Sequence, residues 1–266
     1  MDSRLIDVPG PDGVVSRIRV YQAGSGPDLL FQHSAGGLLP DDPFLTGLAE
    51  HFSVHAPLLP GYEDSEGGDH LRSMLDFTLH AFDVWKALGL ERPLLAGHSM
   101  GGMIAAEMAA VAPDSVGRLV LICPAGLWRD DAPVTDLFAA LPFELPGLLL
   151  HDPERHGHLL SSGGDFNDPE FLTEFMVGNA RRLGTAGKLL FPIPDRGLAS
   201  RLYRIDAATR IIWGKSDRMI DPVYASDFER LIRRAEATII EEAGHMVPYE
   251  QTGRVVEIIT ELRDGP

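Results

Sequence analysis

The sequence predicts an α/β fold, in which a mostly parallel sheet is flanked by helices and an inserted helical cap interrupts the core. Two observations lead to this fold class. Strand and helix patterns alternate through Leu121, which is the order of βαβ units. The alternation then stops and resumes at the apolar run 209–213. With 266 residues, of which 44% are hydrophobic, the chain is long enough to bury one large core.

The N-terminal part predicts a hairpin followed by helices that cover the sheet. Residues 14–21 alternate apolar and polar side chains behind a turn rich in proline and glycine at 9–13, which is typical of a β-hairpin. Further on, apolar side chains recur at helical spacing, at Leu71, Leu75, Phe82 and Trp85. Gly89 follows them, so we expect an amphipathic helix that ends there.

The insertion predicts a cap over the sheet. We expect an α/β core formed by residues 1–126 and 200–266 and a helical cap at 127–199. Within the cap, helical patterns occur at 134–141, 153–160 and 169–183, and prolines break them at Pro142, Pro146, Pro192 and Pro194. Its apolar side chains are suited either to the cap's own packing or to a substrate pocket. They are Trp128, Leu137, Phe138, Leu141, Phe143, Phe171, Phe175 and Met176.

One pentapeptide supplies a candidate nucleophile. Gly97-His98-Ser99-Met100-Gly101 follows the apolar run 93–96 and precedes the helical pattern 102–108. A serine on a sharp turn from strand to helix exposes its hydroxyl, and the flanking glycines avoid collisions with the neighbouring backbone. Ser99 is therefore the predicted nucleophile.

A serine nucleophile needs a base and a carboxylate, and both follow later strand patterns. Asp217 lies just after the run 209–213, and His245 lies just after the strand pattern 237–240. Histidine takes the serine proton, and the carboxylate holds the imidazole in the required tautomer. The rivals for the acid are Asp221, which precedes a proline and resembles a helix N-cap, and the pair Asp130 and Asp131.

These segments together resemble the α/β-hydrolase family, and the resemblance covers nearly the whole chain. It rests on the pentapeptide and on four other segments, at 32–37, 59–65, 213–217 and 244–245. It implies an eight-stranded sheet and a triad in the order serine, aspartate, histidine. It also implies an oxyanion hole formed by the amides of Ala35 and Met100, with His33 bracing that loop and His98 packing inside the turn.

Ser34 is where the chain departs from the family pattern. The family most often has glycine at this position, and a positive φ there would strain a serine by about 1–3 kcal/mol. The oxyanion loop is therefore the part of the site in which the sequence leaves two conformations open.

The resemblance and the motif together predict hydrolysis of a carboxylic ester or lactone of a small, fairly apolar substrate through an acyl-enzyme. No cofactor and no metal are expected. The alternative is carbon–carbon bond cleavage as in meta-cleavage product hydrolases, although Met246 stands where those enzymes have tryptophan. A ligand receptor with a hydrolase fold is the remaining alternative. Serine at the turn argues against epoxide hydrolase and haloalkane dehalogenase chemistry, which use aspartate.

The net charge and the cysteine content of the chain limit the partners and the cellular location that we expect. A net charge of −16 argues against nucleic acid, and we expect a small-molecule substrate and no membrane partner. Cys123 is the sole cysteine, so no intramolecular disulfide forms, and an N-terminus without a signal-like apolar stretch predicts a cytoplasmic protein. The cluster His151, His156 and His158 lacks clean metal-ligand spacing and predicts a solvated loop. Whether the chain is a monomer or a homodimer stays open.

Overall fold

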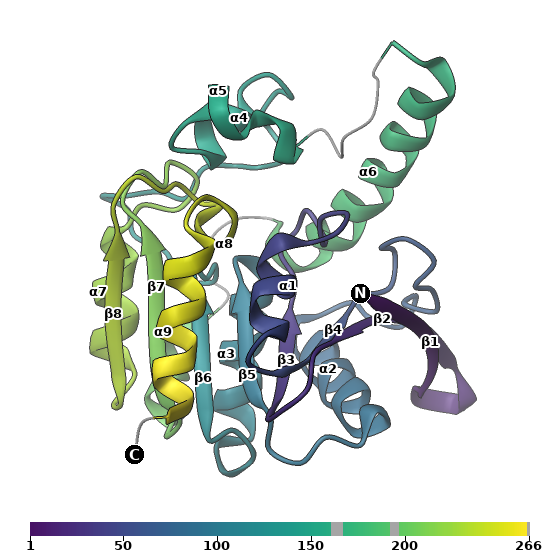
Figure 1. Ribbon diagram of the computed structural model, residues 1–266. Helices are drawn as coiled ribbons and strands as arrows, with labels where there is room; N and C mark the ends of the chain where they lie inside the picture. Colours follow the sequence, from purple (N-terminus) through teal and green to yellow (C-terminus); the bar gives the residue numbers. More distant parts are fainter. Residues whose placement is uncertain (161–166, 192–196, 265–266) are drawn as a thin grey trace.

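The computed structural model describes residues 1–160, 167–191 and 197–264, and it contains one eight-stranded sheet (Figure 1). The strand order is β1-β2-β4-β3-β5-β6-β7-β8. β2 pairs antiparallel with β1 and β4, whereas the remaining neighbours pair in parallel. The predicted fold class is therefore confirmed. The strands are β1 Asp2–Pro9, β2 Val15–Ala23, β3 Asp28–Gln32, β4 Ser53–Pro57, β5 Leu94–His98, β6 Arg118–Ile122, β7 Ala208–Gly214 and β8 Ala235–Ile240.

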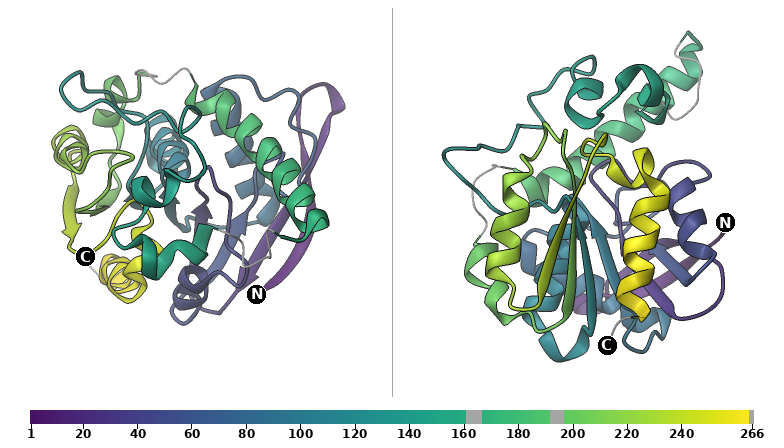
Figure 2. Two further views of the ribbon diagram at one scale, coloured as in Figure 1. Left: turned by 90° about the horizontal axis from the view of Figure 1, so that it is seen from above. Right: turned by 60° about the vertical axis from the view of Figure 1, so that its left-hand side comes forward.

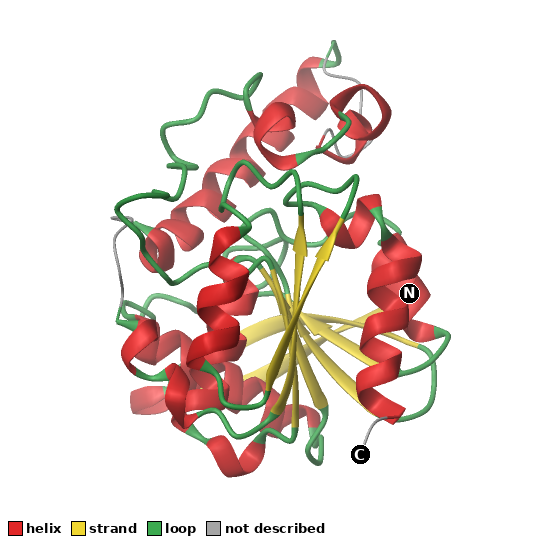
Figure 3. Ribbon diagram, turned by 90° about the vertical axis from the view of Figure 1, so that its left-hand side faces the viewer, coloured by secondary structure: helices red, strands yellow, loops and turns green. Residues whose placement is uncertain are grey.

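Helices cover both faces of the sheet, which appears edge-on in Figure 3. One face packs against α2 Met74–Leu88, α3 Met100–Val111 and α7 Val223–Leu231, and the other against α1 Pro43–Ala49 and α9 Thr252–Asp264. Because helices lie over both faces, the central strands are buried on both sides, and all five residues of β5 are buried. Among the described residues, no helix has the length and apolar character needed to cross a membrane.

The N-terminal hairpin is confirmed, and α2 confirms the predicted helix with one correction. Ser73 and Asp76 form a capping box at its start, and Gly89 ends it in the left-handed conformation with φ 70°. Leu71, however, lies before the helix, and the Leu75 side chain is 55% exposed. Of the other two predicted residues, Trp85 is buried and Phe82 packs against the core. The prediction was therefore wrong at Leu75, and the buried side of α2 also includes residues that were not predicted, namely Phe77, Thr78, His80, Ala81 and Val84.

The predicted helix at 134–141 is absent, and this part of the insertion is a loop with a turn near its end. The Asp136 carboxylate accepts a hydrogen bond from the Phe138 amide at 2.8 Å, and the Thr135 amide donates to the Met219 carbonyl at 3.0 Å. Such local and tertiary hydrogen bonds compete with helix formation. The sequence pattern was apolar enough for a helix but could not show these competing bonds.

The later helices of the insertion are closer to the expectation. A short helix that was not predicted, α4 Leu145–Leu149, has Pro146 in its first turn rather than at a break. The expected helix at 153–160 is present as α5 Pro153–His156 followed by a 3-10 turn, and α6 Pro169–Leu190 is longer than predicted. The breaks expected at Pro192 and Pro194 lie outside the described residues.

The insertion lies above one end of the parallel strands. In Figures 1 and 2, α4 and α5 lie above the ends of β7 and β8, and α6 slants across the same side of the molecule. The strand ends that lead into the turns after β3, β5 and β7 face this side. Open α/β sheets bind ligands outside the carboxyl ends of their strands, so we expect the functional site at this edge of the sheet.

Candidate active site

The turn between β5 and α3 exposes Ser99 by holding it in a strained conformation. Ser99 has φ 56° and ψ −115°, which is rare for a residue with a side chain. The turn is possible because its neighbours are small: a Cβ atom at Gly101 would lie 2.1 Å from the Gln32 carbonyl oxygen. The sequence signal for a strand, a sharp turn and a helix is therefore matched by the backbone.

Ser99, His245 and Asp217 form one hydrogen-bonded row, although 146 positions separate the serine from the histidine. Nε2 of His245 lies 2.8 Å from Oγ of Ser99, and Nδ1 lies 2.7 Å from Oδ2 of Asp217. All three residues are buried. Since a carboxylate only accepts, Nδ1 carries the proton and Nε2 is left to accept the serine hydroxyl.

Asp217 is held by donors on its other sides. Oδ1 accepts hydrogen bonds from the Met219 and Ile220 amides, both at 2.9 Å, and Oδ2 also accepts from Nε1 of Trp213 at 3.1 Å. These bonds restrict the carboxylate to one orientation towards His245.

The rival carboxylates are engaged elsewhere. Asp221 accepts a hydrogen bond from the Val223 amide at 2.8 Å, at the start of α7, which agrees with the predicted capping role. Asp130 accepts from Nε1 of Trp128 at 2.9 Å, and Asp131 forms an ion pair with Arg129. The structure therefore brings Asp217, and none of the three rivals, to His245.

Two further histidines brace the site. His33 donates through Nδ1 to the Ser34 carbonyl at 2.7 Å and accepts the Leu59 amide through Nε2 at 3.0 Å. His98 donates through Nε2 to the carbonyl of His245 at 2.8 Å. Burial lowers the pKa of His33 to about 4 and that of His98 to about 3, so both rings are neutral at neutral pH.

Buried histidines make the stability of the fold fall in acid. Burial also lowers the pKa of His80 in α2 to about 4, against about 6.5 in an unfolded chain. As the pH falls from 6.5 towards 4, the unfolded chain takes up protons that the folded protein does not. The free energy of unfolding therefore decreases by about 1.4 kcal/mol per pH unit for each such histidine.

We expect the His80→Gln variant, altered far from Ser99, to lose stability less steeply over this pH window than the wild-type protein. Denaturant unfolding at several pH values between neutral and about 4 measures the slope. Identical slopes for the two proteins would contradict the role given to His80.

The loop that is predicted to supply an oxyanion-hole amide follows β3. Ala35 lines the same pocket as Ser99, and its carbonyl accepts the Tyr62 hydroxyl at 2.9 Å. Ser34 lies outside the left-handed region, and the positive φ of this loop falls on Gly37 at 86°. The possible strain at Ser34 is thus avoided. Met100 is the first residue of α3, where an amide has no acceptor within its own helix.

A pocket of about 710 Å³ lies between the insertion and Ser99. Most of its wall is apolar, and the predicted cap residues Trp128, Leu137, Phe138, Phe143 and Phe175 contribute to it, together with Ser99 and His245. The other three predicted residues, Leu141, Phe171 and Met176, are not among the described lining residues. Leu38 and Leu39, in the loop after β3, also line the pocket, although they were not predicted from the sequence.

Cys123 was not predicted to lie at the site. Its thiol is within 4.8 Å of ligand atoms of Asp217 and His245, and among the described residues this is the set of three that could share a metal ion. Burial raises the pKa of this thiol well above its usual range, so it stays protonated beside the carboxylate. Its place directly after β6, as Asp217 follows β7, is a signal in the sequence that could have indicated this position.

The histidines of the insertion form no such set among the described residues. Nδ1 of His151 lies 2.7 Å from Oγ of Ser216, and Nδ1 of His158 lies 3.2 Å from the Arg155 carbonyl oxygen. His151 therefore contacts the loop that precedes Asp217 rather than the other two histidines.

Relatives of this chain include proteins with hydrolase names. An uncharacterized protein of Mycobacterium tuberculosis is 27% identical over 270 residues, which cover 91% of this chain and 76% of that protein. The monoacylglycerol lipase ABHD6 of Mus musculus is 28% identical over 224 residues, which cover 77% of this chain and 65% of the lipase. Among solved structures, a bacterial membrane phospholipase A is similar with a TM-score of 0.76 and 26% identity, covering 99% of this chain and 86% of that one.

The family model that matches the chain is described as the alpha/beta hydrolase family. The match runs over residues 24–258 and includes the strands β3 to β8, the turn that carries Ser99 and the loops that carry Asp217 and His245. With most of the chain matched, and with the same fold in the similar structures, this protein belongs to the alpha/beta hydrolase family.

Proposed function

We propose that this hydrolase cleaves a carboxylic ester or lactone with Ser99 as nucleophile, His245 as base and Asp217 as the acid that orients the base. The observation that carries the proposal is the row of hydrogen bonds at 2.8 and 2.7 Å, which opens into an apolar pocket. The names of the related lipase and phospholipase support ester chemistry.

The geometry suits acyl transfer in two steps. His245 accepts the Ser99 proton through Nε2 as Oγ attacks the carbonyl carbon, and the imidazolium is stabilised by the carboxylate of Asp217. The oxyanion is held by the amides of Ala35 and Met100, each worth about 2.7–4 kcal/mol in the transition state. The protonated imidazole gives its proton to the departing alcohol, and water then repeats the sequence on the acyl-enzyme.

The pocket wall supports an apolar acyl or alcohol group. Leucine, phenylalanine and tryptophan side chains from the insertion face Ser99, so a hydrocarbon chain placed there is removed from water. Each buried methylene contributes about 0.8 kcal/mol, or nearly fourfold in affinity, until the chain exceeds the pocket.

A panel of p-nitrophenyl esters of increasing acyl length tests this function. We expect kcat/KM to rise with chain length from acetate, because each added methylene is buried, and then to level off when the pocket of about 710 Å³ is filled. Initial rates are measured at fixed pH for the wild-type protein and for the Ser99→Ala variant. The difference between the two rates is the hydrolysis that depends on Ser99. Hydrolysis of no ester in the panel would contradict the proposed function, and a decline from acetate onwards would contradict the apolar acyl pocket.

A further inference from the structure

One charged side chain stands in the wall of the Ser99 pocket. Among the described lining residues, Arg182 is the single lysine, arginine, aspartate or glutamate, and the rest of the wall is largely apolar. Asn179 precedes it by three positions and also lines the pocket, so α6 presents two polar side chains one turn apart to the substrate space. An apolar pocket with few convergent polar groups uses those groups to orient its ligand.

The guanidinium of Arg182 has no counter-ion in the described part of the chain. No ion pair or hydrogen bond of its side chain occurs there, whereas Arg129 pairs with Asp131 and Asp227, and Arg201 pairs with Glu107. Arg182 is also partly buried. A half-buried cation without a partner is costly unless something else supplies the negative charge.

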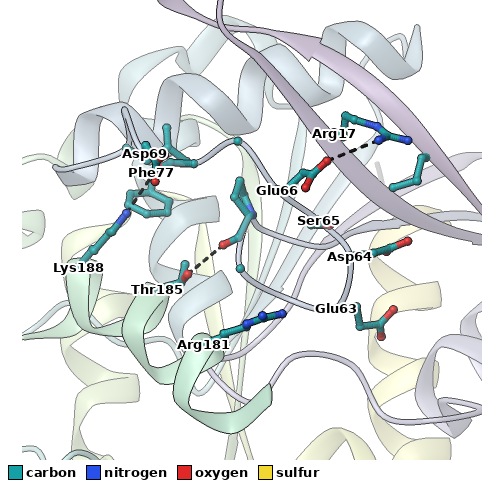
Figure 4. Close-up of a pocket in the computed structure, with 16 residues that line it drawn as sticks. Arg17, Glu63, Asp64, Ser65, Glu66, Asp69, Phe77, Arg181, Thr185 and Lys188 are labelled. Carbon is teal, nitrogen blue, oxygen red and sulfur yellow. Dashed lines mark hydrogen bonds and ion pairs between the residues drawn. The ribbon is translucent and has the colours of Figure 1, made fainter. Parts of the chain in front are cut away.

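The neighbouring residue Arg181 lies on a different face of α6 and does not line the Ser99 pocket. It lines a second pocket, of about 740 Å³, between α6 and the loop 60–69 (Figure 4). That pocket contains the acidic residues Glu63, Asp64, Glu66 and Asp69 and does not include Ser99. The two adjacent arginines therefore face two different environments, one rich in carboxylates and one without any among its described residues.

Arg182 lies beside the loop that holds Ala35. A Cβ atom at Gly37, two residues after Ala35, would be 3.8 Å from Cδ of Arg182. Burial raises the pKa of Tyr62, whose hydroxyl donates to the Ala35 carbonyl, and the positive charge of Arg182 opposes that rise. The guanidinium is thus within reach of the same end of the pocket as the oxyanion loop.

We propose that the substrate is an ester that carries a carboxylate on its otherwise apolar body, and that Arg182, with Asn179, binds this carboxylate. The proposal rests on the proposed function, because it names the substrate class of the same site. A neutral apolar ester would strip water from the guanidinium and give it no partner, whereas a carboxylate would replace that water with charge-assisted hydrogen bonds. The net charge of −16 repels anions at long range, so recognition depends on this local cation.

Binding to the Ser99→Ala variant tests the proposal without any turnover. Two matched ligand pairs are used: monomethyl adipate with methyl hexanoate, and monomethyl suberate with methyl octanoate. Within each pair a terminal carboxylate replaces a methyl group. We expect calorimetry to show the anionic ester of at least one pair binding about 10- to 100-fold more tightly than its neutral counterpart, as charge-assisted hydrogen bonds predict.

Replacing the arginine isolates its contribution. In the Ser99→Ala background, Arg182→Gln should abolish the preference for the anionic ester, while Arg181→Gln, the matched change on the other side of α6, should retain it. The proposal is overturned if the anionic ester is not preferred in either pair, if no ligand of either pair binds, or if both substitutions reduce the preference equally.

Turnover by the wild-type protein separates this proposal from the proposed function. The mono-p-nitrophenyl esters of adipic and suberic acid are compared with p-nitrophenyl hexanoate and octanoate, and we expect the anionic ester to have the higher kcat/KM. Ser99-dependent hydrolysis with no preference for charge would overturn the carboxylate alone. Binding of the anionic esters through Arg182 without any hydrolysis would overturn the proposed function alone.

Discussion

Replacement of Ser99 by alanine is expected to lower kcat for ester hydrolysis by about four to six orders of magnitude, as loss of a nucleophile does in serine hydrolases. The hydroxyl removed is the one that lies 2.8 Å from Nε2 of His245, and no other hydroxyl side chain shares that position among the described residues. The backbone amides of the proposed oxyanion hole would remain, so a small residual rate above that in water is expected.

The fold should survive this substitution. Alanine keeps the Cβ atom and therefore the same strain at φ 56°, and Ser99 makes no side-chain cap to α3 that would be lost. Steady-state kinetics and thermal unfolding of the two proteins check both parts. Near-normal turnover by a folded variant would remove Ser99 from the mechanism.

Asp217→Asn is expected to reduce kcat by about four orders of magnitude, the size seen when a triad aspartate becomes an amide. In the wild-type protein, the carboxylate accepts the Met219 and Ile220 amides through one oxygen, and His245 Nδ1 through the other. The single oxygen of asparagine would be drawn to the two backbone amides. Its NH₂ group would then face Nδ1, and the proton would move to Nε2, where it blocks acceptance of the serine proton.

Asp221→Asn is the matched control. Asp221 lies four positions further along and accepts a hydrogen bond from the Val223 amide at the start of α7. Asparagine at this position keeps a side-chain oxygen that can accept the same hydrogen bond, so we expect the variant to have the kcat of the wild-type protein. Comparison of kcat for the two variants at one pH measures the difference. Equal losses in both would show that the effect comes from the loop rather than from the carboxylate at His245.

The turn around Ser99 could be predicted from the sequence because its causes are local. An apolar strand, glycines where a Cβ atom would collide with backbone, and a helix pattern all lie within about 16 consecutive residues. Asp217 and His245 were found in the same way, since each lies in the loop directly after a strand pattern, and parallel strands place such loops at one edge.

The insertion was harder to predict because its structure depends on contacts distant in sequence. The loop at 134–141 has the apolar spacing of a helix, yet the Thr135 amide donates to Met219, more than eighty residues away. Leu75 likewise suits the apolar face of α2, but the position of the sheet leaves it exposed. Periodicity describes what a segment can bury and does not say which neighbour it will meet.

The amino-acid sequence by itself determined the fold class, the strained turn at Ser99 and the residue types of the site, because short-range sterics and hydrophobic periodicity specify them. Only the tertiary structure decided that His245 meets both Ser99 and Asp217, that Cys123 lies beside them, and that Arg182 faces the pocket while Arg181 faces away. Those relations depend on how distant segments pack, since a side chain's partner is set by three-dimensional position rather than by its neighbours in the chain.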